Sequence, residues 1–128
     1  MVKMREIQAA ARQIARQFHL RQIWLFGSYS HGVAGNDSDV DILILMEGRK
    51  VHDHAIRIRN AIDFPFAVDL IFRSPAEFKR RIAWGDQFLK GIAENGKVLY
   101  ESADTGVDKK SRGRFRRRAA RTLGSKVA

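Results

Sequence analysis

Cysteine is absent from this chain of 128 residues. Its absence excludes a disulfide framework, a zinc site built from thiolates and a cysteine nucleophile, and it fits a reducing compartment. Long hydrophobic runs are absent too. No apolar stretch approaches the ~20 residues that a membrane-spanning helix needs, and residues 1–6 lack the apolar segment of a signal peptide. We therefore expect a cytoplasmic protein that does not associate with a membrane.

Acidic residues are absent from the C-terminal end, although the whole chain carries a net charge of +10. Residues 1–108 hold 15 Lys or Arg against all 14 Asp or Glu, whereas residues 109–128 hold 9 Lys or Arg and no acid. We predict one domain with its own core in residues 1–104 and a basic, disordered tail in residues 105–128. The arginine cluster of the tail, residues 114–121, is a solvated segment, an RNA-binding segment or an arm that docks on a partner.

The spacing of apolar residues predicts alternating helices and strands. Helices are predicted at residues 4–18, 51–62, 74–82 and 86–95. Strands are predicted at residues 22–26, 39–46, 66–72 and 98–100. Ser74 and Asp86 are the expected N-caps, and Ser74 with Pro75 and Glu77 has the form of a capping box.

These elements predict a mixed α/β domain. We expect a small twisted mixed sheet with helices on one face and the functional site on the other. Trp24, Trp84 and the phenylalanines are interpreted as core residues rather than as a platform on which bases stack.

Three carboxylates interrupt strands that otherwise have the composition of a core. Asp39 and Asp41 lie two residues apart and hence on one face of their strand, and Asp69 lies within another strand. Carboxylates are almost never fully buried unless they are paired or bind a metal. If the two strands are neighbours, the three acids converge on an oxygen-lined site that suits magnesium. The alternatives are that Asp39 and Asp41 are turn residues, and that Asp69 forms an ion pair with Arg57.

The dipeptide Gly27-Ser28 ends the first predicted strand and has the features of a phosphate-binding loop. Glycine lets the backbone approach a ligand closely, the amides are donors, and the Ser28 hydroxyl stands at the start of a short helix. Taken alone, the dipeptide also fits an ordinary turn. Together with the carboxylates it indicates two-metal displacement at the α-phosphate of a nucleoside triphosphate, with pyrophosphate as the leaving group.

Gly27-Ser28, ten intervening residues and the Asp-Val-Asp of residues 39–41 resemble the signature of the DNA polymerase beta-like nucleotidyltransferase superfamily. Asp69 stands in the place of its third carboxylate. Within that superfamily, the small size and the Val-Leu-Tyr-Glu ending look like the minimal nucleotidyltransferases, which include the antitoxins of HEPN/MNT toxin-antitoxin pairs. The resemblance spans residues 23–101, and the basic tail matches no part of the family pattern.

The resemblance implies a role for each matched residue. Gly27 and Ser28 would bind the triphosphate of ATP or another nucleoside triphosphate. Asp39, Asp41 and Asp69 would be the catalytic residues and the ligands of two Mg²⁺ ions, and Asp69 would also help to deprotonate the acceptor.

The predicted function is a magnesium-dependent transfer of a nucleoside monophosphate, AMP from ATP, onto a hydroxyl. The catalytic unit takes up the predicted domain, so we expect the acceptor on a partner protein. By resemblance this partner would be a HEPN-type toxin modified on a tyrosine, with the present chain as its antitoxin. One alternative is transfer to a small molecule such as an aminoglycoside, and another is an antitoxin that neutralises its partner by binding alone. No sequence pattern indicates an oligomeric state.

Overall fold

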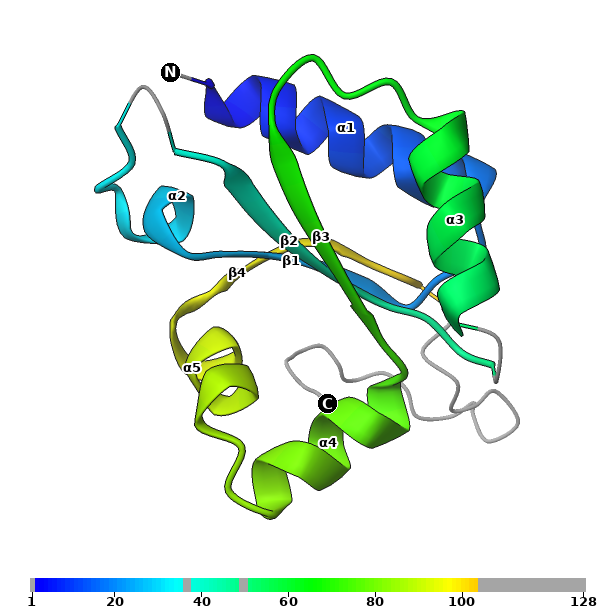
Figure 1. The fold of residues 1–128 in the computed structure, drawn as a ribbon, viewed down its shortest axis with the longest axis vertical. Coiled ribbons are helices and arrows are strands. Elements are labelled where there is room, and N and C mark those ends of the chain that lie inside the picture. Colours follow the sequence, from blue (N-terminus) through cyan, green and yellow to red (C-terminus); the bar gives the residue numbers. More distant parts are fainter. Residues whose placement is uncertain (1, 36–37, 49–50, 104–128) are drawn as a thin grey trace.

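Five helices and four strands make up the part of the chain that the computed structural model describes, residues 2–35, 38–48 and 51–103 (Figure 1). The helices are α1 (Met4–Gln17), α2 (Ser28–His31), α3 (Val51–Ala61), α4 (Pro75–Ala83) and α5 (Gln87–Asn95). The strands are β1 (Gln22–Phe26), β2 (Val40–Leu45), β3 (Val68–Arg73) and β4 (Lys97–Glu101). The predicted helices and strands are thus confirmed, and β3 begins two residues later than the sequence predicts.

The predicted basic tail, residues 105–128, lies outside the described residues, and so do the three alternatives for its role. The domain boundary after residue 104 therefore stays a prediction. In the described part of the chain, no helix has both the length and the apolar character that crossing a membrane requires.

The four strands form one mixed sheet in the order β3-β2-β1-β4. Strand β1 pairs antiparallel with both β2 and β4, whereas β2 and β3 are parallel. Helix α3 lies between β2 and β3 in the chain and supplies the crossover that parallel neighbours require. The predicted mixed α/β fold is confirmed.

Helices cover both faces of the sheet, which corrects the expectation of helices on one face. Ile42 and Ile44 pack with residues of α1 and α3, whereas Leu43 and Leu45 pack with residues of α4 and α5. In Figure 1, α1 lies above the strands and α4 and α5 lie below them. The physical reason is that β2 is apolar on both of its sides, so both sides must be removed from water. We call the α1 and α3 side the first face and the α4 and α5 side the second face.

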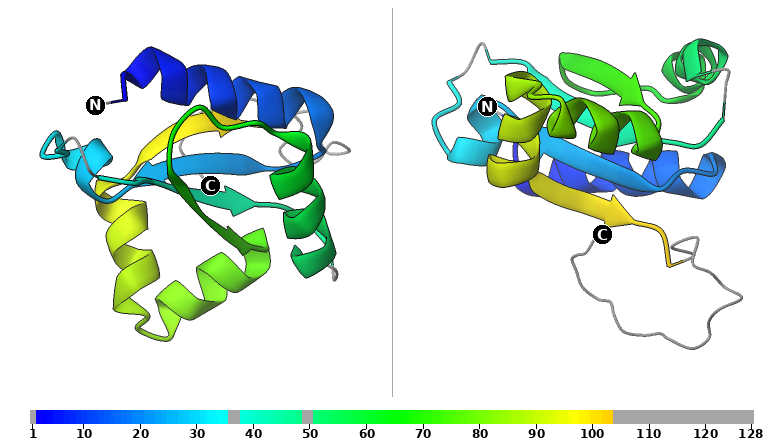
Figure 2. Two further views of the ribbon diagram at one scale, coloured as in Figure 1. Left: turned by 45° about the horizontal axis from the view of Figure 1, so that its top comes forward. Right: turned by 90° about the horizontal axis from the view of Figure 1, so that it is seen from below.

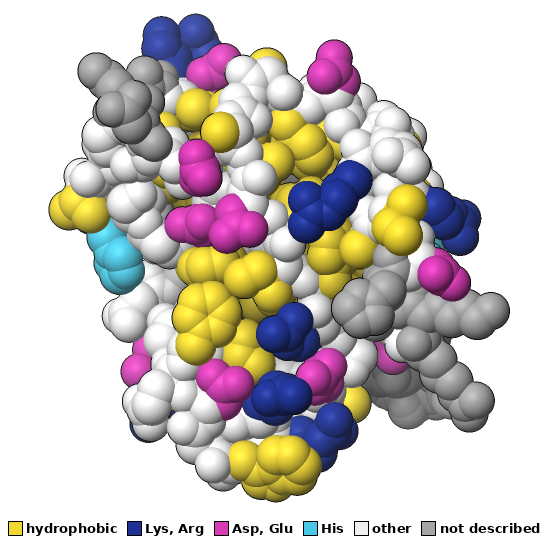
Figure 3. Space-filling model, viewed as in Figure 1, with side chains coloured by type: hydrophobic (Ala, Val, Ile, Leu, Met, Phe, Trp, Pro, Cys, Tyr) yellow, Lys and Arg dark blue, Asp and Glu magenta, His cyan; other side chains and the backbone are white. Residues whose placement is uncertain are grey.

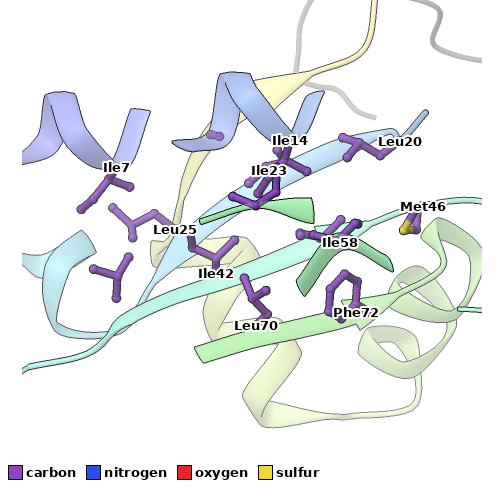
Figure 4. Packing of buried hydrophobic residues seen from close by; sticks show 14 of the residues in the cluster. Ile7, Ile14, Leu20, Ile23, Leu25, Ile42, Met46, Ile58, Leu70 and Phe72 are labelled. Atoms are coloured by element: carbon purple, nitrogen blue, oxygen red, sulfur yellow. The ribbon is translucent and has the colours of Figure 1, made fainter. Parts of the chain in front are cut away.

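The first face carries the larger core. Figure 4 shows Ile7 and Ile14 of α1 close to Leu25 and Ile23 of β1, respectively, and Ile58 of α3 next to Phe72 of β3. The four isoleucines are fully buried. Burying a side chain of this size stabilises a fold by roughly 1.5–3 kcal/mol, so this cluster dominates the stability of the domain.

The second face has a smaller core. Its buried members are Phe26, Leu43, Leu45, Phe78, Leu89 and Ile92. The Ser74 hydroxyl accepts a hydrogen bond from the Glu77 amide (3.1 Å), and the Asp86 carboxylate accepts one from the Leu89 amide (3.0 Å), so both predicted N-caps are confirmed. The Glu77 carboxylate pairs with Arg81 (2.8 Å) and does not return to the N-cap, so the predicted capping box is only half formed.

The two tryptophans differ in their surroundings. Trp24 packs against the second-face core, with its ring 6.1 Å from that of Phe78. Trp84 is 76% exposed, and the Arg80 guanidinium lies over its ring at 5.5 Å. The core interpretation is therefore wrong for Trp84, which is the exposed C-cap residue of α4.

Arginine side chains cover part of the outer edge of β3. Met46 N donates to Arg73 O, and since carbonyls alternate along a strand, the carbonyls of Leu70 and Phe72 point away from β2. Arg59 Nη2 donates to Leu70 O (3.0 Å), and Arg73 Nη1 donates to Phe72 O (2.8 Å). The outward carbonyls of Leu70 and Phe72 thus have a hydrogen-bond donor within the domain.

Candidate active site

The first residues of β2 and β3 bring two of the predicted carboxylates side by side. The parallel register pairs Asp41 with Asp69, and the antiparallel register pairs Asp41 with Phe26, the last residue of β1. Asp39 precedes β2 by one residue and is exposed, as is Asp69, whereas Asp41 is partly buried. Alternation along β2 places Asp41 on the second face with Leu43. The condition on which the predicted acidic site rests, that the two strands are neighbours, is met.

The surroundings of Asp41 raise its pKa above the ordinary value of an aspartate. Burial is the largest cause, and the negative charges of Asp69 and Asp39 add to it. Within the described residues, no Lys, Arg or His forms a salt bridge with any of the three acids, so the alternative that Asp69 pairs with Arg57 finds no support. Three neighbouring negative charges without a cationic side chain favour a cation from solution.

Gly27 lies directly against the Asp41 carboxylate. Its backbone has φ of +75°, a left-handed conformation that side chains disfavour, and a Cβ atom at this position would overlap Asp41 Oδ2. Glycine is therefore required here for two independent reasons, conformation and space. The contact also joins the predicted phosphate-binding loop to the predicted metal site.

The loop after β1 is held by a serine that the sequence analysis does not single out. Ser30 donates from both its hydroxyl (2.8 Å) and its amide (3.1 Å) to the carbonyl of Gly27. The spacing of three residues after a strand-ending glycine is the sequence signal that could have identified it. The Ser28 hydroxyl, in contrast, has no hydrogen-bond partner within the described residues and is half-buried at the start of α2. Ser30 therefore fixes the loop, and Ser28 has a donor to offer to a ligand.

The donor set of the acidic site suits a hard divalent cation. Magnesium prefers oxygen ligands and commonly keeps waters and substrate phosphates in its shell, so it needs only one or two protein carboxylates. Among the described residues, no group of three acidic or histidine side chains is close enough to hold a metal ion by itself. Joint magnesium binding by Asp39, Asp41 and Asp69 therefore stays a prediction.

Comparisons of the sequence with known proteins find relatives of this chain. The model of the family described as the nucleotidyltransferase domain matches residues 7–100. A protein of Methanocaldococcus jannaschii named "Putative protein adenylyltransferase MJ0604" is 32% identical over 83 residues. That match covers 63% of this chain and 79% of the relative.

Two crystal structures have a similar fold. One is of a "putative nucleotidyltransferase" from Sulfolobus solfataricus, with a TM-score of 0.55 and 22% identity over 76% of this chain and 78% of that chain. The other is of a toxin-antitoxin complex with AMP-PNP, with a TM-score of 0.50 and 23% identity over 76% of this chain and 75% of that chain. At these identities the likeness supports the arrangement of helices and strands.

Proposed function

The chain belongs to the nucleotidyltransferase domain family, and we propose that it transfers AMP from ATP to a hydroxyl of a partner protein. One observation carries the proposal: Gly27 lies against the carboxylate of Asp41, and Asp41 is paired with Asp69 on the next strand. A loop suited to phosphates and carboxylates suited to magnesium thus meet at one end of the sheet. The name of the relative from Methanocaldococcus jannaschii supports a nucleoside monophosphate of the AMP type and a protein acceptor.

Each residue of the site has a role in this proposal. Asp39, Asp41 and Asp69 would hold two Mg²⁺ ions. Bound magnesium supplies positive charge against the charge that develops on the phosphates. Gly27 lets the loop lie against the Asp41 carboxylate and would bind the triphosphate through its backbone, and Ser28 would donate its hydroxyl to a phosphate oxygen.

The acceptor hydroxyl approaches from the side of β3. Its oxygen forms a bond to the α-phosphorus, the bond between the α-phosphorus and the bridging oxygen breaks, and pyrophosphate leaves. The acceptor proton passes to Asp69, which is exposed at the start of an outer strand and within reach of a group carried by another protein.

We further propose that the acceptor is a tyrosine of a HEPN-type toxin and that this chain is its cytoplasmic antitoxin. The family resemblance of the Gly-Ser and Asp-Val-Asp motifs motivates this partner. The similar fold of a chain in a toxin-antitoxin complex with AMP-PNP supports it.

The test is incubation of the chain with α-labelled ATP, Mg²⁺ and the product of the neighbouring reading frame. We expect label on the neighbouring product with the wild type and none with the double variant Asp39→Asn/Asp41→Asn. Asp63→Asn, which removes an exposed acid outside the site, is the matched control and keeps the wild-type labelling.

Three outcomes would contradict the proposal in different ways. Absence of label from all four nucleotides, despite tight association, would leave a binding module. Label on an aminoglycoside but on no protein would make the acceptor a small molecule. Full neutralisation of the toxin by the double variant would mean that binding alone suffices.

A further inference from the structure

A half-exposed aromatic side chain borders the candidate active site. Phe88 lies in the first turn of α5 and is 52% exposed. Its ring and the ring of Phe26 form a T-shaped pair, with the centroids 5.6 Å apart and the planes at 86°. The core interpretation of the phenylalanines is correct for Phe26, which is buried, and wrong for Phe88, which is half-exposed.

Phe26 connects this ring to the acidic site. It is the last residue of β1, it is paired with Asp41 across the sheet, and it directly precedes Gly27. Side chains that are opposite each other in an antiparallel pair lie on the same face with Cβ atoms about 5 Å apart. Phe88 therefore lies on the second face, where it contacts the Phe26 ring that neighbours Asp41. Figure 3, in the view of Figure 1, shows acidic side chains directly next to a group of hydrophobic side chains.

The site described above accounts for the phosphates of a nucleotide and leaves the base without a partner. Gly27, Ser28 and the three carboxylates offer donors, space and metal ligands, none of which recognises a planar ring. An exposed phenyl face is the kind of surface on which a nucleobase stacks, because every base has a flat apolar face. We propose that Phe88 contacts the base of the bound nucleoside triphosphate, an inference that rests on the proposed transferase function.

The order of the strands favours the base over the acceptor as the group at Phe88. Asp69, which takes the acceptor proton, is on β3, and Asp41 is on β2 in the middle. Phe88 packs on β1, on the opposite side of Asp41 from Asp69. An acceptor protein at Asp69 and a base at Phe88 thus occupy different sides of the reacting phosphate.

The experiment compares the binding of AMP-PNP with that of inorganic tripolyphosphate, both with Mg²⁺, by isothermal titration calorimetry. Tripolyphosphate reports on the phosphate and metal site without a base. We expect Phe88→Ala to weaken AMP-PNP binding about tenfold, the usual effect of removing a stacked aromatic side chain, and to leave tripolyphosphate binding unchanged. Phe88→Tyr, which keeps the ring, retains AMP-PNP binding.

Two further variants separate the base contact from packing. Phe88→Leu keeps apolar contact with Phe26 but removes the flat ring, and we expect it also to weaken AMP-PNP binding selectively. Trp84→Ala removes the exposed tryptophan that stacks with Arg80 and has no ring contact with Phe26, so it is the matched control with wild-type affinities.

Equal weakening of both ligands, or wild-type affinity for AMP-PNP in Phe88→Ala and Phe88→Leu, would overturn the inference. A higher KM for the acceptor with unchanged AMP-PNP affinity would overturn it as well and assign Phe88 to the acceptor. Failure of the wild type to bind either ligand would instead refute the proposed function, on which the inference depends.

Discussion

The two faces of the sheet are built from the same strands but differ in how completely they are closed. Among the described residues, the core on the first face contains 15 buried hydrophobic residues, and the core on the second face contains 6. Asp41 and Asp69 belong to the second face, at the end of the sheet where β2 and β3 start. The larger core thus supplies stability on one side, and the smaller core leaves room for charged and exposed groups on the other.

The difference between the cores of the two faces explains why the fold tolerates the three neighbouring carboxylates. Holding like charges together without a cation disfavours the folded state, as the raised pKa of Asp41 indicates. Residues that serve a ligand in this way commonly reduce stability, which other parts of the fold must offset. In this domain the core of the first face supplies the offsetting stability. The following variants test the comparison between the two faces.

Truncation of one isoleucine on each face should give the largest change in stability. Ile14 of α1 is fully buried on the first face, and we expect Ile14→Ala to lower the free energy of unfolding by about 3 kcal/mol. Ile82 of α4 is only half-buried against the second-face core, and Ile82→Ala should cost about 1 kcal/mol. Urea denaturation measures both. Equal losses would remove the contrast between the faces.

Substitution of the glycine at the acidic site should affect activity more than stability. Gly27→Ala places a methyl group against the Asp41 carboxylate, and we expect kcat/KM to fall by about a hundredfold, the effect of a small misplacement in an active site. Gly32→Ala is the matched control. Its φ of +73° is also positive and lies in the left-handed helical region, but no atom lies within 4 Å of an added Cβ, so Gly32→Ala should lose stability and keep activity. Equal activity in the two variants would refute the contact.

Removal of an N-cap should weaken the second face moderately. The Ser74 hydroxyl caps α4, and Ser74→Ala should lower the free energy of unfolding by about 1 kcal/mol. Glu77→Gln removes only the exposed pair with Arg81 and should cost less than about 0.5 kcal/mol. Thermal unfolding of the two variants provides the comparison, and a larger loss in Glu77→Gln than in Ser74→Ala would contradict the role of the Ser74 hydroxyl as the main cap of α4.

Neutralisation of Asp41 should stabilise the metal-free protein slightly. Because folding raises the pKa of Asp41, the folded state holds its proton to higher pH than the unfolded chain does. Wild-type stability therefore falls as the pH rises from the unfolded pKa to the folded pKa, and the loss persists at neutral pH. In the presence of a chelator, Asp41→Asn should raise Tm at neutral pH and have little effect at acid pH. A lower Tm at neutral pH would indicate that Asp41 stabilises the fold.

The helices, strands and acidic positions could be predicted from the sequence because they depend on local spacing. The spacing of Asp39 and Asp41 fixes their common face, and the caps at Ser74 and Asp86 mark where helices start. The pairing of Asp41 with Asp69 could be stated only as a condition, since strand order is a property of the whole fold.

Other features could not be predicted because they depend on contacts between distant segments. The apolar run of β2 indicates a buried strand, but it does not say which helices cover each of its sides. Phe88 and Ile92 are four residues apart in α5, and this spacing looks the same whether one or both face the core. The overlap that excludes a side chain at Gly27 follows from the position of Asp41 on another strand.

The arginine side chains on the outer edge of β3 limit how a partner can associate with the sheet. A strand from another polypeptide would meet carbonyls that already accept from Arg59 and Arg73, and it would have to displace two positive charges to form a ladder. The edge is therefore a poor template for fibril growth. Asp69 is the second residue of this same strand. The proposed acceptor protein would therefore present its hydroxyl there through side chains alone, and it could dissociate after modification without breaking a shared β-sheet.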